Sequence, residues 1–319
     1  MRRLLSCALA ATVGCLAVLG GVSPAAAEPR LRPSPAAVER ALHCTGQLAR
    51  GRRPVLLLHG TTSSPRANWS WTWDRALDQR GWAHCDLASP DSANGDIQLN
   101  GEYVVRAIRI MHRRADRRIS IVGHSQGGMV ARWAFRFWPD TRAMVADYVG
   151  LSSSNHGTST FAGQCNATTR CTPADWQQMS GSRFLAALNR GRETYPGIDY
   201  TEISTTYDEV VVPSTSPYLT PGPHVTNVAV QDVCPTETVD HFGMAYDNAA
   251  WLIGLDALTH PGPAVPDRVD RSTCGRPFMP AVDPASFPAN VATALSQTAR
   301  SSATSPTTDA EPPLRSYAR

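Results

Sequence analysis

Short apolar runs alternate along this chain with longer segments in which apolar positions recur with the period of a helix. A continuous apolar run of strand length, bounded by turn residues, is typical of a buried strand in a parallel sheet. The pattern predicts strands at residues 54–58, 81–87, 119–122, 147–151, 202–206 and 225–230, and helices at residues 36–48, 73–80, 100–114, 129–138 and 244–258. Because strands and helices alternate, we expect an α/β fold with a mostly parallel sheet covered by helices on both faces.

The pattern changes at both ends of the chain. Residues 1–27 combine Arg2 and Arg3 with an apolar stretch and small residues up to Ala27, which is typical of a secretion signal cleaved near Ala27. A membrane anchor is the alternative, although the apolar stretch is short for a spanning helix. Residues 291–319 are rich in Ser, Thr and Pro, which predicts a disordered tail. One folded domain, residues 28–290, is expected between them.

The cysteines of the mature chain are expected to form disulfides. Beyond the expected signal they are Cys44, Cys85, Cys165, Cys171, Cys234 and Cys274. An even number in an exported chain predicts three disulfides, although their pairing cannot be deduced from the number alone. The C-x-x-C pairs of structural zinc sites are missing, so no metal is expected.

The charged residues argue against one class of partner. The formal net charge is +3, lysine is absent, and the arginines form no long run. Nucleic-acid binding would call for a basic block or stripe, so no nucleic-acid partner is expected.

One motif carries the strongest chemical signal. Gly123-His124-Ser125-Gln126-Gly127 follows the strand expected at 119–122 and precedes the helix expected at 129–138. A G-x-S-x-G sequence between a strand and a helix is the nucleophile elbow of the α/β-hydrolase fold. The small glycines let strand and helix pass closely, and the helix N-terminus favours negative charge at the serine. Ser125 is therefore the expected nucleophile.

A serine hydroxyl needs a base, and in this fold the acid and then the histidine follow the nucleophile along the chain. The histidines downstream of Ser125 are His156, His224, His241 and His260. His241 is expected to be the base because it follows the last predicted strand and precedes the helix at 244–258. His224 remains an alternative.

The acid is expected just after the strand at 202–206. Asp208 lies there, and a carboxylate in that place can orient the imidazole and stabilise its charged form. Glu209 is adjacent and should point elsewhere. Asp232 and Asp240 are alternatives, although both are more typical of solvated loop acids.

An oxyanion hole needs N–H or O–H donors where negative charge develops. One donor is the N–H of Gln126, the residue after the nucleophile. The other is expected in the turn after the first buried strand, where Thr61 offers its N–H and its hydroxyl and Gly60 permits close approach of substrate. His59 is expected to pack beneath this turn.

Several stretches together resemble a known family, the secreted lipases of the Candida antarctica lipase B type and their bacterial class 2 relatives. The similar stretches are residues 68–69, 81–85, 100–108, 124–133, 155–158, 176–181, 207–211 and 240–241. The resemblance covers most of the chain from Cys44 to about Cys274. It departs from the yeast enzyme at His124, in the insertion around Cys165 and after Cys274.

The resemblance implies an α/β-hydrolase with Ser125, Asp208 and His241 as its triad, and Thr61 and Gln126 in its oxyanion hole. It also implies that Gln178 lies near the acyl pocket. The pairings Cys44–Cys85 and Cys234–Cys274 match the spacing in that family, which leaves Cys165–Cys171 as the third.

The function expected is a secreted serine carboxylic-ester hydrolase, a triacylglycerol lipase or esterase that works through an acyl-enzyme without a cofactor. An acyltransferase or polyester depolymerase could use the same triad, and a non-catalytic binding protein is a remote alternative. The expected partner is an ester or lipid substrate, with transient contact to lipid interfaces. We expect a monomer.

Residues 155–182, rich in Gly, Thr and Asn, interrupt the alternation of strands and helices. Within this loop insertion, residues 158–180 are expected to form a flap beside the active site, because they follow the strand at 147–151 and ligand clefts form at strand C-terminal ends. Phe161, Trp176 and Met179 could then face an acyl chain. A surface loop packed on the domain is the alternative.

Overall fold

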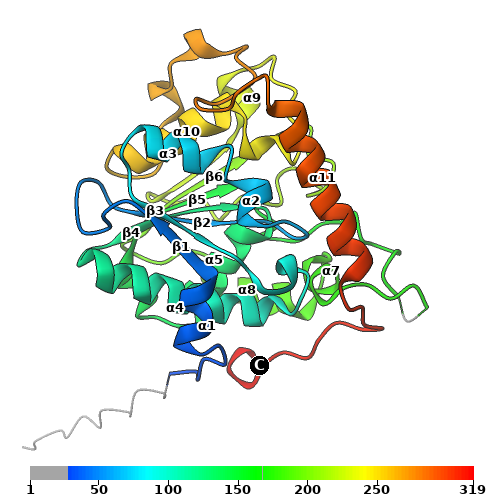
Figure 1. The fold of residues 1–319 in the computed structure, drawn as a ribbon. Coiled ribbons are helices and arrows are strands. Elements are labelled where there is room, and N and C mark those ends of the chain that lie inside the picture. The colour runs from blue at the N-terminus through cyan, green and yellow to red at the C-terminus, as the bar shows by residue number, and fades with distance from the viewer. Residues whose placement is uncertain (1–27, 167) are drawn as a thin grey trace, which may run out of the picture.

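The computed structural model describes residues 28–166 and 168–319, and the expected signal segment lies outside them. Its centre is a seven-stranded sheet in the order β1-β3-β2-β4-β5-β6-β7 (Figure 1). The strands are β1 (Leu42–Thr45), β2 (Val55–Leu58), β3 (His84–Leu87), β4 (Ile119–His124), β5 (Val145–Leu151), β6 (Asp199–Ser204) and β7 (Val225–Ala229). All neighbours are parallel except β1 and β3. The α/β fold class is therefore confirmed.

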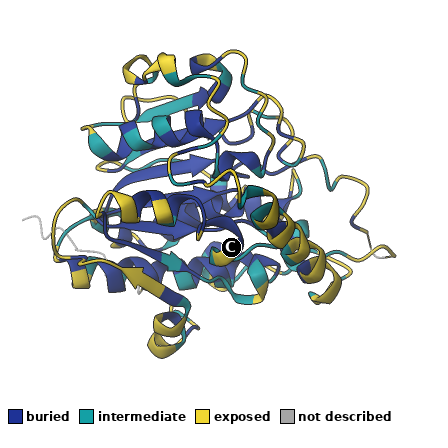
Figure 2. Cartoon of the chain, turned by 45° about the horizontal axis from the view of Figure 1, so that its top comes forward, coloured by how far each residue is buried: buried dark blue, intermediate teal, exposed yellow. Residues whose placement is uncertain are grey.

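Alternate residues of the buried strands face two hydrophobic cores. In β2, Leu56 and Leu58 pack on the side of α4 (Ile97–Ala115) and α5 (Gln126–Phe137). Val55 and Leu57 pack on the side of α3 (Trp73–Gln79) and α10 (Asn248–Thr259). Both faces are covered, which explains why β2 is apolar at every position (Figure 2).

The remaining elements are short, apart from one helix near the end of the chain. They are α1 (Pro35–Ala41), α2 (Pro65–Asn68), α6 (Thr141–Met144), α7 (Pro173–Gln178), α8 (Arg183–Asn189), α9 (Val230–Val233) and the 3₁₀ turns η1 (Pro90–Ala93), η2 (Gly243–Ala245), η3 (Pro266–Arg268), η4 (Arg271–Thr273) and η5 (Ser316–Ala318). The helix predicted at 36–48 ends early, because Leu42 begins β1, whose ladder with β3 aligns Cys44 with Cys85. None of the described helices is both long and apolar enough to cross a membrane.

The prediction that residues 291–319 form a disordered tail is wrong, because residues 287–304 form the helix α11 (Phe287–Thr304). Figure 1 shows α11 running along one side of the molecule, where it contacts α2. Asn94 of the η1 region donates a hydrogen bond to the hydroxyl of Ser301 at 2.5 Å. The polar composition therefore reflects a helix whose hydroxyls find partners on the domain.

The segment after α11 is also tied to the domain. The Glu311 carboxylate accepts the N–H groups of Arg183 and Phe184, which are free donors at the N-terminus of α8. Tyr317 packs against Trp133 and Trp138. The folded domain therefore extends well beyond residue 290.

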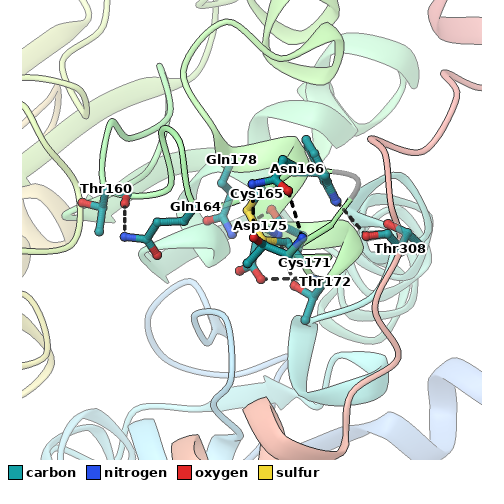
Figure 3. The surroundings of a disulfide bond; sticks show 12 residues. Thr160, Gln164, Cys165, Asn166, Cys171, Thr172, Asp175, Gln178 and Thr308 are labelled. Carbon is teal, nitrogen blue, oxygen red and sulfur yellow. Dashed lines mark hydrogen bonds between the residues drawn. A yellow bond between two sulfur atoms is a disulfide. The ribbon is translucent and has the colours of Figure 1, made fainter.

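The described residues contain three disulfides, with the expected pairings. Cys44–Cys85 joins β1 to β3, Cys234–Cys274 joins the end of α9 to η4, and Cys165–Cys171 closes a short loop. The third lies beside Thr172 and Thr308 (Figure 3). Cys171 and Thr308 exchange main-chain hydrogen bonds of 3.1 and 2.8 Å, so this loop is held by the C-terminal segment.

A pair of partly buried carboxyl groups makes stability depend on pH. Burial and the neighbouring Asp74 carboxylate raise the pKa of Asp86 to about 9. Burial likewise raises the pKa of Asp74, which shares a hydrogen bond with Asp86. The folded chain thus keeps a proton that the unfolded chain releases above about pH 4, so the free energy of unfolding falls as pH rises from there toward about pH 9.

We expect Asp86→Asn to raise the unfolding midpoint at about pH 8 by roughly 3 °C or more, and to change it little near pH 4. The amide carries no charge and can still hydrogen-bond to Asp74. Thermal unfolding of both proteins across this pH range measures the effect. An equal shift at every pH would contradict the proton-linkage argument, and Asp116→Asn, at an exposed position, is the control.

Candidate active site

Ser125 lies on a strained turn between β4 and α5. Its φ is 57° and ψ −123°, in a region that residues other than glycine rarely adopt. Gly123 and Gly127 make the turn feasible. A Cβ atom on Gly127 would lie 2.0 Å from the carbonyl oxygen of Leu58, and one on Gly123 would lie 2.4 Å from the main-chain nitrogen of Gly128. The elbow expected from the sequence is therefore formed.

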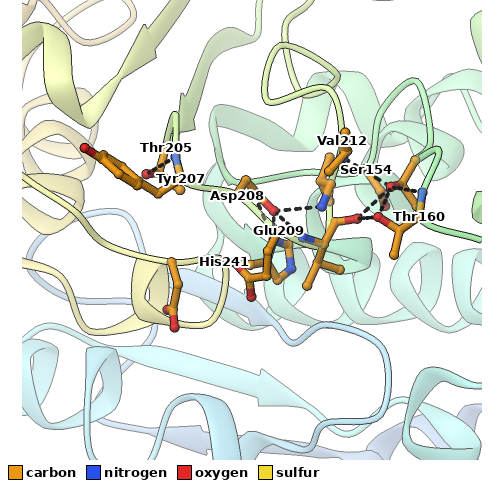
Figure 4. Close-up of polar contacts among 12 residues, drawn as sticks. Ser154, Thr160, Thr205, Tyr207, Asp208, Glu209, Val212 and His241 are labelled. Carbon is orange, nitrogen blue, oxygen red and sulfur yellow. Dashed lines mark hydrogen bonds and ion pairs between the residues drawn. The ribbon is translucent and has the colours of Figure 1, made fainter.

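Asp208 and His241 meet beside this turn. Nδ1 of His241 lies 2.9 Å from each carboxylate oxygen of Asp208 (Figure 4). The N–H groups of Val210 and Val211 also donate to Asp208 Oδ1, at 3.0 and 2.7 Å. Burial opposes ionisation of Asp208, but the hydrogen bonds and charge of His241 and the N–H of Val211 outweigh it and lower the pKa. The carboxylate is therefore ionised and oriented.

The alternative histidines pair elsewhere. His156 bonds to Glu193 at 2.7 Å, His224 to Asp199 at 2.8 Å, and His260 lies 3.0 Å from Asp256. None of these three lines the cavity that contains Ser125 and His241.

The alternative acids also have other partners. Asp232 accepts the N–H of Ala229, Asp240 accepts that of Gly243, and Glu209 accepts the main-chain N–H of His241 at 3.1 Å. Only Asp208 bonds to the His241 ring among the described residues.

Ser125 and His241 open into one cavity of about 420 Å³. Because Nδ1 of His241 faces Asp208, the other ring nitrogen is left for the cavity. Within the described part of the chain, Ser125 Oγ and His241 make no hydrogen bond to one another. Such a contact often tightens only when substrate binds.

Thr61 is presented to the same cavity with its hydroxyl already oriented. Its oxygen accepts hydrogen bonds from the side-chain amides of Gln126 and Gln178, each at 2.9 Å. With both acceptor positions used, the hydroxyl proton is free to donate into the cavity. Gln126 begins α5, so its main-chain N–H has no acceptor within the helix. A Cβ atom on Gly60 would lie 3.0 Å from Cβ of Ser125, so the turn passes close to the elbow.

His59 lies beneath this turn and outside the cavity lining. Its Nε2 accepts the N–H of Ser89 at 3.1 Å, and its Nδ1 lies 2.8 Å from the carbonyl oxygen of Gly60. Burial lowers the pKa of His59 to about 4, so the ring is neutral. Its geometry fits the packing role expected from the sequence.

The segment expected to form a flap, residues 158–180, supplies only some of the predicted residues to the cavity lining. Phe161 and Gln178 line the cavity, but Met179 and Trp176 do not. Met179 ends α7 and pairs with Thr158 through the main chain, while the Trp176 indole donates to the carbonyl of Thr308. The prediction that Met179 faces the acyl chain is therefore wrong, because the residue terminates a helix whose other side faces the cavity.

The wall that sequence reasoning missed is α11. Ala294, Leu295, Thr298 and Ser302 line the cavity from this helix. Leu295, Thr298 and Ser302 are three and four residues apart, and this helical spacing is the signal that could have revealed the helix. Asn68, His124 and Phe242 also line the cavity and were not predicted to do so. Among residues 28–166 and 168–319, no group of three or more His, Cys, Asp or Glu side chains could hold a metal ion.

Comparison with known proteins places this geometry in a family. The sequence profile of the family described as Lipase (class 2) matches residues 52–248. Lipase B of Pseudozyma antarctica is 29% identical over 244 residues, which are 74% of this chain and 70% of that protein. A triacylglycerol lipase of Pseudomonas fragi is 28% identical over 110 residues, or 33% of this chain and 36% of that one.

Solved structures of lipases have a similar fold. The crystal structure of Aspergillus fumigatus lipase B superposes with a TM-score of 0.84 at 28% identity, covering 92% of this chain and 74% of that one. A Bacillus licheniformis lipase, BlEst2 in its mature form, shares the fold with a TM-score of 0.50 at 15% identity, over 67% of this chain and 95% of that one. The profile match spans more than half of the sequence, and the chain therefore belongs to the class 2 lipases, a family of carboxylic-ester hydrolases.

Proposed function

We propose that this enzyme hydrolyses carboxylic esters through an acyl-enzyme on Ser125, with His241 as general base and Asp208 as the group that orients it. The observation that carries the proposal is the Asp208–His241 pair, in which His241 lines the same cavity as Ser125 on its strained turn between strand and helix. Thr61 and Gln126 would supply the oxyanion hole.

In the first step His241 takes the proton from Ser125 Oγ, which attacks the ester carbonyl carbon. The carbonyl oxygen becomes an oxyanion that the N–H of Gln126 and the N–H and hydroxyl of Thr61 stabilise. The imidazolium of His241, stabilised by Asp208, then protonates the leaving alcohol. In the second step His241 takes a proton from a water molecule, which attacks the carbonyl carbon of the acyl-enzyme. The acid is released and Ser125 recovers its proton from His241.

The cavity supports a lipid-like ester as substrate. Phe161, Val210, Val211 and Leu295 give it an apolar lining beside Ser125, which suits an acyl chain. The relatives named lipase B and triacylglycerol lipase support the same class of ester. Leu295 lines the cavity and is 61% exposed, so it would also contact a lipid interface.

The location proposed is extracellular, after removal of a signal that ends near Ala27. The three disulfides support it, since such bonds persist mainly in oxidising compartments. A monomeric state remains a prediction.

Labelling with a fluorophosphonate tests the proposed chemistry. The reagent should form one adduct that peptide mass spectrometry maps to Ser125, and a p-nitrophenyl ester substrate should protect against it. An adduct on another residue, or turnover that persists after complete labelling, would exclude the proposed mechanism. The same enzyme assayed on tributyrin emulsions and on soluble esters separates a lipase from an esterase.

A second measurement tests the acyl wall. We expect Phe161→Ala and Leu295→Ala to lower kcat/KM for decanoate esters roughly tenfold, while kcat/KM for acetate esters changes little. Only a long acyl chain has CH₂ groups that lose contact with these side chains. Met179→Ala is the matched control, since Met179 lies on the same insertion but outside the cavity lining. Equal losses for all chain lengths would mean that this wall does not hold the acyl group.

A further inference from the structure

His124, the residue before Ser125, is buried beside the triad with both ring nitrogens in polar contact. Its Nε2 lies 3.0 Å from the main-chain carbonyl oxygen of His241. Its Nδ1 lies 3.1 Å from the side-chain oxygen of Asn68. The rings of His124 and His241 are 5.1 Å apart, inclined at 35°. The proposed mechanism assigns no task to His124 or to Asn68.

The protonation state of His124 follows from its partners. A carbonyl oxygen only accepts, so the contact with His241 requires the proton on Nε2. Burial and the neighbouring His241 lower the pKa of His124 to about 3, so the ring is neutral and Nδ1 must accept. The Asn68 amide nitrogen is buried without a hydrogen-bond partner in the described structure. Turning that amide by half a rotation would let its nitrogen donate to Nδ1 and satisfy both groups.

The main chain of His241 is thereby held at two points. Its N–H donates to Glu209, the neighbour of Asp208, and its carbonyl accepts from His124, the neighbour of Ser125. His241 itself lies in a turn outside any helix or strand. The loop that carries the imidazole is therefore tied to the segments that carry the other two triad members.

We propose that His124 is a positioning residue for His241: its Nε2–H holds the carbonyl of His241 and keeps the imidazole between Asp208 and Ser125, while Asn68 orients the His124 ring. This inference rests on the proposed triad. A displacement of about 1 Å in a reacting group can lower a rate roughly a hundredfold, so the hydrogen bond acts on kcat more than on KM. The titratable groups whose charges act on the His124 ring are His241, Asp208 and His59.

Two amide substitutions separate this role from simple packing. In His124→Gln the amide nitrogen can reach the position of Nε2 and donate to His241, whereas in His124→Asn the shorter amide reaches only toward Asn68. His124→Leu keeps the volume and removes both hydrogen bonds. We expect kcat for p-nitrophenyl butyrate to fall roughly tenfold to hundredfold in the Leu and Asn variants with KM little changed, and the Gln variant to restore most of it.

The pH profile adds a readout that a packing role would not move. If the His241 loop loosens, the Asp208–His241 bond weakens and the imidazolium loses stabilisation. The acidic limb of the kcat/KM profile should then move to lower pH in the Asn and Leu variants, and the downfield proton resonance of that hydrogen bond should broaden. If His124→Leu does not fold, the difference in kcat between His124→Gln and His124→Asn still tests the positioning role.

Three results would overturn the inference. The first is an unchanged kcat in His124→Leu, and the second is equal losses in the Gln and Asn variants. The third is losses that follow the unfolding temperature alone, without a shift of the acidic limb. Failure of the triad itself would look different, because Ser125→Ala would then retain turnover whatever the His124 variants do.

Discussion

Replacing Ser125 by alanine is expected to lower kcat for ester hydrolysis by a factor of about 10⁴ or more. The hydroxyl is the atom that would form the acyl-enzyme, and the residual rate would come from the oxyanion hole and substrate binding. The turn itself should persist, because alanine has the same Cβ in the same strained conformation and Ser125 is only 6% exposed. The free energy of unfolding should change by less than about 1 kcal/mol.

Steady-state assays of the purified protein measure kcat. Urea unfolding of the same samples measures the free energy of unfolding. Ser180→Ala is the control, because Ser180 is exposed and lies outside the cavity lining. Ester turnover near the wild-type rate in Ser125→Ala would remove Ser125 from the mechanism. A large loss of stability would mean that the lost rate reflects unfolding.

Gly127→Ala is expected to produce the largest loss of stability of any single change considered, about 3 kcal/mol or more. The added methyl group would lie 2.0 Å from the carbonyl oxygen of Leu58 and 2.9 Å from that of His59, both main-chain atoms. Relief therefore requires β2 or α5 to move. Because β2 leads into the turn that carries Thr61, activity should fall even in the molecules that remain folded.

Denaturant unfolding and fluorophosphonate labelling rates of the folded fraction test this prediction. Gly222→Ala is a matched control, since a Cβ there meets nothing within 4 Å and its φ is not positive. A Gly127→Ala protein with wild-type stability and labelling rate would contradict the close packing of the elbow.

The parts of the site that the sequence could predict are those with local signatures. Ser125 has a motif and flanking strand and helix patterns, and the chain order of the fold pointed to Asp208 and His241. The structure places Ser125 and His241 in the lining of one cavity, and Asp208 bonds to the His241 ring from outside that lining. A strand such as β2 could be predicted because burial on both faces leaves it no polar position.

The parts that could not be predicted depend on tertiary contacts. The polar composition of α11 (Phe287–Thr304) suggested disorder, yet the helix is held by partners such as Asn94, distant in sequence. Met179 was expected in the cavity, but it follows the last residue of α7 in an extended conformation and its main chain pairs with that of Thr158. The role inferred for His124 depends on a carbonyl 117 residues later, which no sequence window reveals.

The position of α11 has a consequence for biosynthesis. Ser125 and Thr61 leave the ribosome long before Leu295 and Thr298, yet all four border the same cavity. A chain synthesised only as far as residue 293 therefore lacks the wall that α11 contributes. The cavity can be complete only after residues 294–302 have emerged, so the last helix of the chain sets the moment at which the whole site exists.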